Sequence, residues 1–422
     1  MEFFKLNLDP HLQKGIVDQG YTELTDVQEQ TLSHTLQGKD VAVQSQTGTG
    51  KTAAFLITIM ERLSKKNTPD FKFSLILVPT RELAVQIEKE ARQLSRHMRC
   101  AVGSFYGGVG YNRQLESLRK GVDIVIGTPG RLIDLNQKGY LRLKEVETLV
   151  IDEADRMFDM GFLPDITKLI QSMPLQKHRQ SMLFSATLNR FSRTIAYKHM
   201  NDPVFIELTP DQMTVDTISQ ELYFVKSHIK LNLMLGILKA ETPQTALIFT
   251  NTRHVAFRLS QKLKANGYRC QHLTGELPQN QRLKVIDDFK KGKIPLLVAT
   301  DVAARGLHID NLDMVFNYDV PQDSENYVHR IGRTARAGKK GKAVTLASEG
   351  TASHLEAIEA FIGMSIPVQP ENFDLIANDR SYLESHRKRT TELNRSRNER
   401  SPQSRGRKTY RPSHSQSQTY AR

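Results

Sequence analysis

One stretch of this chain has the residue types that bind a phosphate group. The short apolar run Val41–Gln44 leads into the loop Ser45-Gln46-Thr47-Gly48-Thr49-Gly50-Lys51-Thr52, and an apolar helical pattern follows. A strand, a glycine-containing loop and a helix in this order turn backbone N–H groups and the positive end of the helix toward phosphate oxygens. Lys51 adds a positive charge, and Thr52 adds a hydroxyl that can bind Mg²⁺. Although Ser45 replaces the first glycine of the general pattern, we predict a nucleotide site formed by Gln46, Thr47, Gly48, Thr49, Gly50, Lys51 and Thr52; the alternative is a turn that binds nothing.

A second segment would add carboxylates to this site. Asp152, Glu153 and Asp155 directly follow the apolar run Leu149–Ile151. The carboxyl end of a buried strand is where open α/β sheets bind their ligands. We therefore predict that Asp152 holds Mg²⁺ and that Glu153 positions and deprotonates the water that attacks the γ-phosphate.

Two arginines in the second half of the chain could complete the site. The segment His329–Gly338 reads HRIGRTARAG and presents Arg333 and Arg336 three positions apart. This half contains no G-K-[ST] loop, so the sequence predicts one nucleotide site rather than two. We predict that Arg333 and Arg336 meet the charge that develops on the γ-phosphate during hydrolysis. The alternative is a basic surface helix.

The elements that would position these groups are short apolar runs separated by amphipathic stretches. Continuously apolar runs of this length predict parallel strands covered on both faces, and their arrangement predicts two successive α/β units. The runs are 41–44, 75–78, 124–126, 149–151 and 182–184 in the first unit, and 246–249, 296–298, 314–316 and 343–346 in the second. Pro203, Pro210 and Asp211 interrupt the pattern, so we place the break near residues 201–217.

The composition favours an intracellular protein. No run approaches the ~18 apolar residues of a membrane span, and the first residues lack the pattern of a signal peptide. Cys100 and Cys270 fit neither a metal-binding spacing nor a disulfide framework. We expect a cytoplasmic protein with reduced thiols and no membrane contact.

The positive charge of the chain is concentrated at its end. Residues 380–422 hold 12 Lys and Arg against 3 Asp and Glu, a balance of +9, which leaves +4 of the total of +13 for the remaining residues. The segment is rich in Ser, Gln, Asn and Thr, and tyrosines lie between its arginines. It predicts a disordered tail that makes salt-sensitive contacts with phosphates and bases. The alternative is a solvated tail that only aids solubility.

Four motifs in a fixed order carry a family resemblance. They are DEAD at 152–155, SAT at Ser185–Thr187, TDVAARG at Thr300–Gly306 and HRIGRTAR from His329. From Phe3 to about Phe361 the chain resembles the DEAD-box family of ATP-dependent RNA helicases, and it is most similar to the bacterial members. The resemblance implies ATP and Mg²⁺ as cofactors and an α/β fold of two tandem RecA-like parallel-sheet domains, to which the composition adds the disordered basic C-terminal tail. The implied divisions are 1–208, a linker at 209–217, a second domain at 218–370 and the tail at 371–422.

The resemblance also implies roles for further residues. It implies that Phe3 stacks on the adenine and that Gln28 hydrogen-bonds to it. It implies coupling of the nucleotide state to strand separation by Ser185, Thr187, Asp155 and His329. Contacts with the RNA sugar-phosphate backbone are implied for Pro79, Thr80, Arg81, Gly108, Thr128 and Arg131 in the first unit and for Gly275, Gln279, Arg282 and Thr300 in the second.

The chain departs from the family pattern at two positions. Leu24 stands where the adenine-reading motif usually has proline, so the local turn is expected to differ. His308 stands where the family usually has an aspartate that meets the ATP ribose. An imidazole can still hydrogen-bond to a hydroxyl but differs in length and charge, so we hypothesise that His308 weakens ATP affinity in the closed state.

Three functions are compatible with these residues. The resemblance favours an RNA-stimulated ATPase that binds RNA without sequence preference and separates short duplexes. A DNA-directed translocase and an ATP-gated clamp that nucleates a ribonucleoprotein are the alternatives. The resemblance further implies a role in ribosome assembly or RNA decay, with a ribonucleoprotein or ribosomal precursor as partner. We also expect a monomer.

Overall fold

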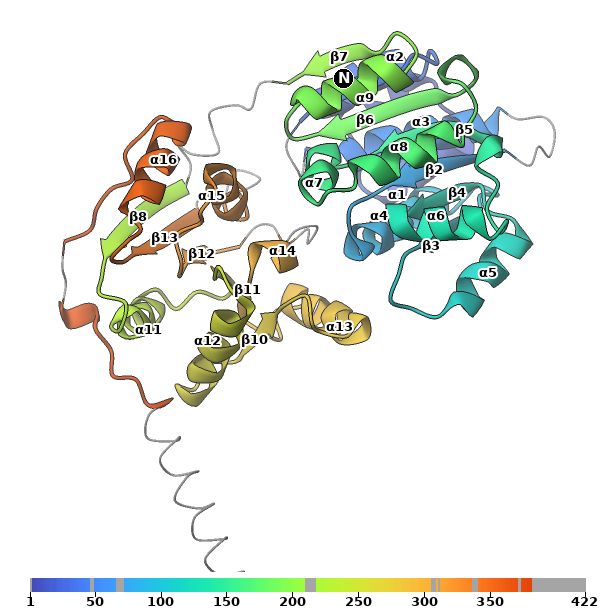
Figure 1. Ribbon diagram of the computed structural model, residues 1–422. Helices are drawn as coiled ribbons and strands as arrows, with labels where there is room; N and C mark the ends of the chain where they lie inside the picture. Colours follow the sequence, from blue (N-terminus) through green and yellow to red (C-terminus); the bar gives the residue numbers. More distant parts are fainter. Residues whose placement is uncertain are drawn as a thin grey trace, which may run out of the picture.

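The protein folds into two α/β domains that lie side by side (Figure 1). The computed structural model describes residues 2–45, 49–65, 72–208, 218–304, 309, 312–335, 341–370 and 373–381. Each domain contains one sheet in which every pair of neighbouring strands is parallel. The predicted fold of two successive parallel-sheet units is confirmed.

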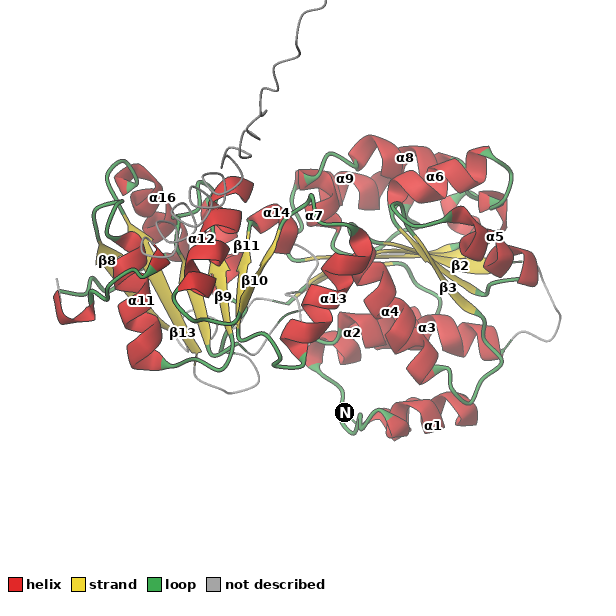
Figure 2. Ribbon diagram, turned by 90° about the horizontal axis from the view of Figure 1, so that it is seen from below, coloured by secondary structure: helices red, strands yellow, loops and turns green. Residues whose placement is uncertain are grey.

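The first domain contains a seven-stranded sheet with the order β3-β4-β2-β5-β6-β1-β7. Its strands are β1 (Val41–Gln44), β2 (Phe73–Leu77), β3 (Val102–Phe105), β4 (Ile124–Gly127), β5 (Val146–Ile151), β6 (Gln180–Ser185) and β7 (Val204–Glu207). One face is covered by α1 (Pro10–Asp18), α2 (Asp26–Thr35), α3 (Lys51–Ser64) and α4 (Arg81–Leu94). The other face is covered by α5 (Tyr111–Lys120), α6 (Pro129–Gln137), α7 (Ala154–Asp159), α8 (Leu163–Gln171) and α9 (Arg190–His199) (Figure 2). Short 3-10 turns are η1 (Phe3–Leu6), η2 (Leu143–Glu145) and η3 (Gln176–His178).

The second domain contains a six-stranded sheet with the order β10-β11-β9-β12-β13-β8. Its strands are β8 (Ile218–Phe224), β9 (Ala246–Phe249), β10 (Cys270–Leu273), β11 (Leu296–Ala299), β12 (Met314–Asn317) and β13 (Gly341–Ala347). Helices α11 (Lys230–Glu241) and α12 (Arg253–Ala265) pack on one face. The other face carries α13 (Gln279–Lys290), α14 (Asp301–Ala304), α15 (Ser324–Ile331) and α16 (Ala352–Ile362), and a 3-10 turn, η4 (Phe373–Leu375), follows.

The order of the strands decides which loops meet. Alternate side chains of β1 enter the two opposite cores, with Val41 and Val43 on the α1–α4 side and Ala42 on the other. Strand β6 lies between β5 and β1. Because all carboxyl ends of a parallel sheet share one edge, the loop after β1, the acidic segment after β5 and the SAT segment after β6 meet there.

The predicted start of the tail at residue 371 is too early. Residues 373–381 pack against the second domain: Ala377 exchanges hydrogen bonds with Asn232 of α11 (Ala377 N to Asn232 O, 3.0 Å; Asn232 Nδ2 to Ala377 O, 2.8 Å), and Asn266 Nδ2 donates to Asp379 Oδ1 at 2.8 Å. A Cβ at Gly236 would lie 1.5 Å from the carbonyl oxygen of Leu375, so this close approach requires glycine. The second domain therefore extends to Ser381, and residues 382–422, which hold most of the predicted tail, lie outside the described residues.

Candidate active site across two domains

Lys51, which is predicted to bind phosphate, lies at the start of α3 and is buried. Its Nζ donates to the carbonyl oxygen of Ser45 at 2.5 Å, and the hydroxyls of Ser45 and Thr49 are 2.7 Å apart. Burial lowers the pKa of Lys51, while the charges of Asp152 and Glu153 oppose this shift. An ammonium held in this way among carboxylates suits a ligand that combines phosphate charge with a divalent cation. Of the predicted ligands, Thr49, Gly50 and Thr52 are placed beside Lys51, and Gln46, Thr47 and Gly48 lie outside the described residues.

Gln28, predicted to bind adenine, is attached to the phosphate loop. Its Oε1 accepts from the backbone N–H of Thr25 at 2.9 Å, and its Nε2 donates to the carbonyl oxygen of Gly50 at 3.2 Å. The hydroxyl of Thr25 donates to Thr49 O at 2.8 Å. Gly50 has φ +95°, and a Cβ there would lie 2.4 Å from Gln28 Nε2, so only glycine fits. A base bound at Gln28 would therefore contact a side chain that is hydrogen-bonded to the predicted phosphate loop.

Phe3, predicted to stack on adenine, is 4% exposed and packs in the core of the first domain. Its ring is stacked on that of Tyr21, with centroids 5.9 Å apart. Tyr21 hydrogen-bonds in turn to the carboxyl group of Glu90 on α4. One face of the Phe3 ring is therefore covered by Tyr21. Stacking of Phe3 on adenine stays a prediction.

Glu90 makes the stability of this region depend on pH. Burial raises its pKa from 4.5 to about 7, the negative charge of Asp152 adds to the shift, and the hydrogen bond from Tyr21 opposes it. Because the folded-state pKa is raised, protonated Glu90 favours folding, and this stability is lost as the pH rises from about 4.5 to about 7. Glu90→Gln is therefore expected to stabilise the protein at pH 8, by up to roughly 3 kcal/mol, and to have little effect at pH 4.5.

Urea unfolding at pH 4.5 and pH 8 checks this expectation. The exposed Glu23→Gln serves as control and should leave the pH dependence unchanged. Equal unfolding free energies of Glu90→Gln and the wild type at pH 8 would show that ionisation of Glu90 does not destabilise the folded protein.

The acidic segment after β5 has a constrained backbone. Asp152 is buried, its N–H donates to Leu77 O at 3.0 Å, and its Oδ1 accepts from the N–H of Glu153 at 3.0 Å. Burial raises the pKa of Asp152, and the charge of Lys51 opposes the shift. Glu153 adopts a left-handed conformation with φ 53°, which is unfavourable for a residue with a side chain. The charges of Asp152 and Glu153 both act on Lys51, so the two carboxylates lie near this lysine at the sheet edge.

An arginine that the sequence reasoning missed holds the predicted catalytic carboxylate. Arg156 Nη1 donates to Glu153 Oε2 at 2.7 Å, and both side chains are largely buried. The two residues are three positions apart across the start of α7, a spacing that brings side chains together on a helix. This spacing was the signal that could have revealed the pair.

The acidic segment is also fixed to the segment after β6. The N–H of Asp155 donates to the Ser185 hydroxyl at 3.0 Å, and the Asp155 Oδ2 accepts from the N–H of Ala186 at 3.1 Å. The carbonyl oxygen of Thr187 accepts from the hydroxyl of Ser192, at 3.4 Å. The bonds at Ser185 lie within the first domain. His329 lies on α15 of the second domain, and its coupling role stays a prediction.

The predicted arginine segment begins on α15 beside acidic groups of the other domain. Arg333 is buried, and its N–H donates to Arg330 O at 3.2 Å in the turn after the helix. Burial raises the pKa of Glu325 in the first turn of α15, and the charges of Asp323, Asp159 and Asp155 add to it. Asp155 and Asp159 belong to α7, so α15 is close enough to α7 for their charges to interact. Arg336 and His308 lie outside the described residues.

Two guanidinium groups gather at the predicted RNA-contacting edge of the first domain. Arg81, at the start of α4, lies over Gly108, where a Cβ would be 2.0 Å from its Nη1. Arg131 stacks 4.3 Å over the ring of Tyr111. Burial lowers the pKa of Arg131, and the charge of Arg81 adds to this effect, so an anion beside both would be stabilised. Thr80 and Thr128 are the residues before α4 and α6, and Pro79 is buried two residues after the end of β2.

The predicted RNA-contacting residues of α13 contact the first domain instead of lying open. Arg282 Nε donates to Glu82 Oε1 at 2.5 Å and Gln279 Nε2 donates to the same oxygen at 3.0 Å. Arg81 Nη1 donates to Gln279 Oε1 at 3.4 Å. Figure 2 shows α13 beside α4 at this contact. Gly275, in contrast, has open space where a Cβ would be, and Thr300 begins the turn of α14 by accepting two backbone N–H groups.

Comparison with known proteins places these residues in a family. The sequence model described as DEAD/DEAH box helicase matches residues 25–195, and the one described as helicase conserved C-terminal domain matches residues 229–338. The ATP-dependent RNA helicase RhlB of Shewanella oneidensis is 44% identical over 393 residues, which cover 92% of this chain and 90% of that protein.

The chain belongs to the DEAD/DEAH box helicase family. The family prediction is thereby confirmed, and so is the predicted enzyme class, an ATP-dependent helicase. The structure of Saccharomyces cerevisiae Dbp5 bound to RNA and ADP BeF3 is similar to this helicase with a TM-score of 0.77 at 29% identity, covering 93% of this chain and 99% of Dbp5. The structure of Mss116p bound to ssRNA and AMP-PNP also has a TM-score of 0.77, at 28% identity, and covers 93% of this chain and 85% of Mss116p.

Proposed function

We propose that this helicase is an RNA-stimulated ATPase that closes its two domains on single-stranded RNA and thereby separates short RNA duplexes. The observation that carries this proposal is the contact of Arg81 and Glu82 with Gln279 and Arg282. This contact brings predicted RNA-contacting residues of the two domains next to each other, Arg81 in the first and Gln279 and Arg282 in the second. The relatives named above support RNA as the substrate, since Dbp5 and Mss116p were solved with RNA.

In the proposed reaction, residues of the first domain bind the nucleotide and orient water. Lys51 would move from Ser45 O to the phosphates, and Gln28 would link the base to the loop. Glu153, held by Arg156, would accept the proton of the attacking water. Arg333 and Arg336 would stabilise the charge that develops on the γ-phosphate.

Thr52 and Asp152 would hold Mg²⁺ together with phosphate oxygens. In the described part of the chain, no three His, Cys, Asp or Glu side chains gather to form a metal site. A site of one carboxylate and one hydroxyl suits Mg²⁺, which keeps waters and relies on substrate phosphates. When bound, the cation would neutralise charge on the phosphate oxygens.

Cys100 and Cys270 are free thiols, which bears on the compartment in which the enzyme acts. Burial raises the pKa of Cys100 to about 12 and that of Cys270 to about 11, which keeps both free thiols protonated and unreactive. No helix in the described ranges is long and apolar enough to cross a membrane. We propose a cytoplasmic monomer whose substrates belong to ribosome assembly or RNA decay, with ribonucleoproteins as partners.

ATP turnover with single-stranded RNA, with single-stranded DNA and with neither tests the function. Stimulation by RNA alone, together with separation of a short RNA duplex, is the expected result. Equal stimulation by DNA would favour the alternative of a DNA-directed translocase. RNA binding that depends on ATP but proceeds without turnover would favour a clamp.

Loss of the contact between the domains should weaken RNA stimulation. The side chains of Glu82 and Arg282 are 9% and 10% exposed, so removing one charge leaves the other poorly solvated. Glu82→Gln is expected to raise the RNA concentration for half-maximal ATPase activity about tenfold or more. Glu88→Gln on the same helix, whose partners Arg92 and Ser104 belong to the first domain, is the control. Identical RNA titrations of Glu82→Gln and the wild type would show that this contact does not assist closure.

A further inference from the structure

Arg131, predicted to contact the RNA backbone, is held by a segment that contains none of the predicted site residues. Its Nη1 donates to Gln114 Oε1 at 2.9 Å, and its Nη2 donates to Val109 O at 3.4 Å. Its carbon Cζ lies 4.3 Å over the ring of Tyr111. These contacts all come from residues 109–114, which lead into the first turn of α5. One short segment therefore decides where this guanidinium lies.

The partners of Arg131 are themselves fixed to the sheet. Gln114 is 7% exposed, and its Nε2 donates to the carbonyl oxygen of Tyr106, the residue after β3, at 3.1 Å. The N–H of Thr128, directly before α6, donates to Phe105 O at the end of β3, also at 3.1 Å. The end of β3 therefore bonds to the start of both helices, α5 with Gln114 and α6 with Arg131.

The ring of Tyr111 attracts a second cation from α6. Lys138 Nζ lies 4.6 Å over this ring and donates to the Tyr111 hydroxyl at 3.1 Å. The same ammonium lies 2.8 Å from Asp134 Oδ1. Because the face of an aromatic ring is electronegative, it stabilises both cations. Tyr111, the first residue of α5, therefore contacts α6 near its start through Arg131 and directly after its end through Lys138.

Arg131 keeps N–H groups with which it can bind an anion. In the described residues, the bonds to Gln114 and Val109 use two of the guanidinium donors, and the others can bind phosphate oxygens. The charge of Arg81 acts on Arg131, so the two guanidinium groups repel each other. A ring that holds Arg131 in place against this repulsion keeps two positive charges together, and an anion beside both is stabilised.

We propose that Tyr111 is a positioning residue, whose ring holds the Arg131 guanidinium in the orientation that binds a phosphate of the RNA. This inference rests on the proposed function and deepens it. Tyr111 acts through Arg131 and needs no contact with RNA of its own. An arginine side chain that is already ordered loses less conformational entropy when the phosphate arrives, so RNA is bound more tightly.

Tyr111→Leu and Tyr111→Phe test the role of the ring. Leucine stays apolar but has no aromatic face, whereas phenylalanine loses only the hydroxyl that accepts from Lys138. Tyr111→Leu is expected to raise the Kd for single-stranded RNA, measured with AMP-PNP present, about 3- to 20-fold. Tyr111→Phe should stay within about twofold of the wild type, as should the KM for ATP of both variants. If Tyr111→Leu does not fold, Tyr111→Met takes its place.

A double variant shows whether Tyr111 acts through Arg131. Arg131→Ala should raise the Kd for RNA at least as much as Tyr111→Leu does. Adding Tyr111→Leu to Arg131→Ala should raise it no further, because the ring then has no guanidinium to hold. A general structural defect would instead weaken RNA binding by the same factor in both backgrounds.

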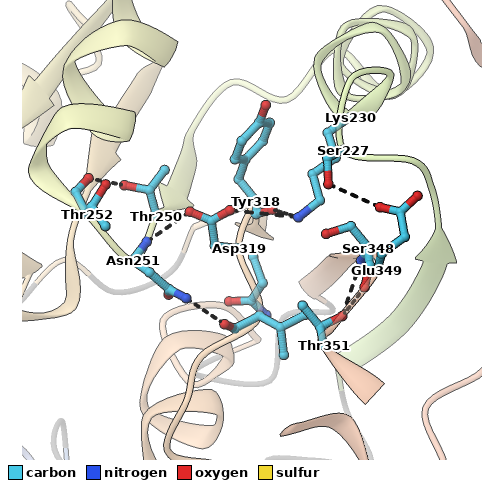
Figure 3. A network of polar contacts seen from close by, with 12 residues as sticks. Ser227, Lys230, Thr250, Asn251, Thr252, Tyr318, Asp319, Ser348, Glu349 and Thr351 are labelled. Atoms are coloured by element: carbon cyan, nitrogen blue, oxygen red, sulfur yellow. Dashed lines mark hydrogen bonds and ion pairs between the residues drawn. The ribbon is translucent and has the colours of Figure 1, made fainter. Parts of the chain in front are cut away.

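Tyr318→Leu is the matched control, because Tyr318 also has a cation over its ring. Lys230 Nζ lies 5.6 Å over that ring and donates to Tyr318 O at 3.0 Å, within a polar network of the second domain (Figure 3). The same Nζ lies 3.7 Å from Asp319 Oδ1. No contact with nucleotide or RNA is predicted for Tyr318. Its replacement should lower the melting temperature and leave the Kd for RNA unchanged.

The outcomes separate the two proposals. A Kd for RNA within about twofold of the wild type in folded Tyr111→Leu overturns the positioning role. So does an equal loss of affinity in Tyr111→Phe or Tyr318→Leu, and so does a double variant in which the two losses multiply. A wild-type enzyme that RNA does not stimulate overturns the proposed function instead.

Discussion

Replacement of Glu153 by glutamine is expected to lower the RNA-stimulated kcat by about 10²- to 10⁴-fold, the usual contribution of a general base. The amide keeps the size of the side chain and can still contact Arg156, which now donates to Oε2 at 2.7 Å. It cannot accept a proton from water. The KM for ATP should change little, because Glu153 would act on water and not on the nucleotide.

Single-turnover ATP hydrolysis on saturating RNA measures this effect. Glu145→Gln is a suitable control, because Glu145 also pairs with an arginine three positions away, Arg142, but on the surface. The control should hydrolyse ATP at the wild-type rate. A Glu153→Gln enzyme within about threefold of the wild type would remove Glu153 from the reaction.

Truncation of Arg333, which belongs to the second domain, should lower the RNA-stimulated kcat by a factor of similar size. Arginines that meet the transferring phosphoryl group are worth about 10³-fold or more in kcat. Arg333→Ala is therefore expected to retain RNA binding and ATP binding and to lose most hydrolysis. Arg333 lies in the turn after α15, and the first turn of the same helix is close enough to α7 for their carboxylates to interact.

The same single-turnover assay applies to Arg333→Ala, with Arg193→Ala as control. Arg193 pairs with Glu207 at the surface of the first domain, and no contact with nucleotide or RNA is predicted for it. Undiminished hydrolysis by Arg333→Ala, with a normal Arg193→Ala control, would show that the first domain hydrolyses ATP without this arginine.

The apolar runs revealed the interior strands and missed the edges. The strands not predicted are β3, β7, β8 and β10, and these are the four edge strands of the two sheets. Interior strands of a parallel sheet are buried on both faces and therefore read as continuous apolar runs. Edge strands are partly solvated, so β10 carries Gln271 and His272, and β8 alternates buried residues with exposed ones such as Ser219.

In the site, too, residues within one short stretch could be predicted from the sequence, and contacts between distant stretches could not. The phosphate loop and the acidic segment were predictable because each is one short stretch with its own strand and helix. Arg131 is 17 positions from Gln114, and Arg282 is 200 positions from Glu82. The pattern of residues within one helix or strand cannot predict such pairs, because they depend on the strand order and on the approach of the two domains.

Energy transfer between dyes on the two domains tests the central claim, that the catalytic site is assembled when the domains meet. Cysteines at exposed Gln137 and Gln261 can be labelled selectively, because burial raises the pKa of Cys100 and Cys270. The distance between the dyes should shorten only when RNA and AMP-PNP are both present. An unchanged distance with both ligands, in an enzyme that RNA still stimulates, would contradict the account.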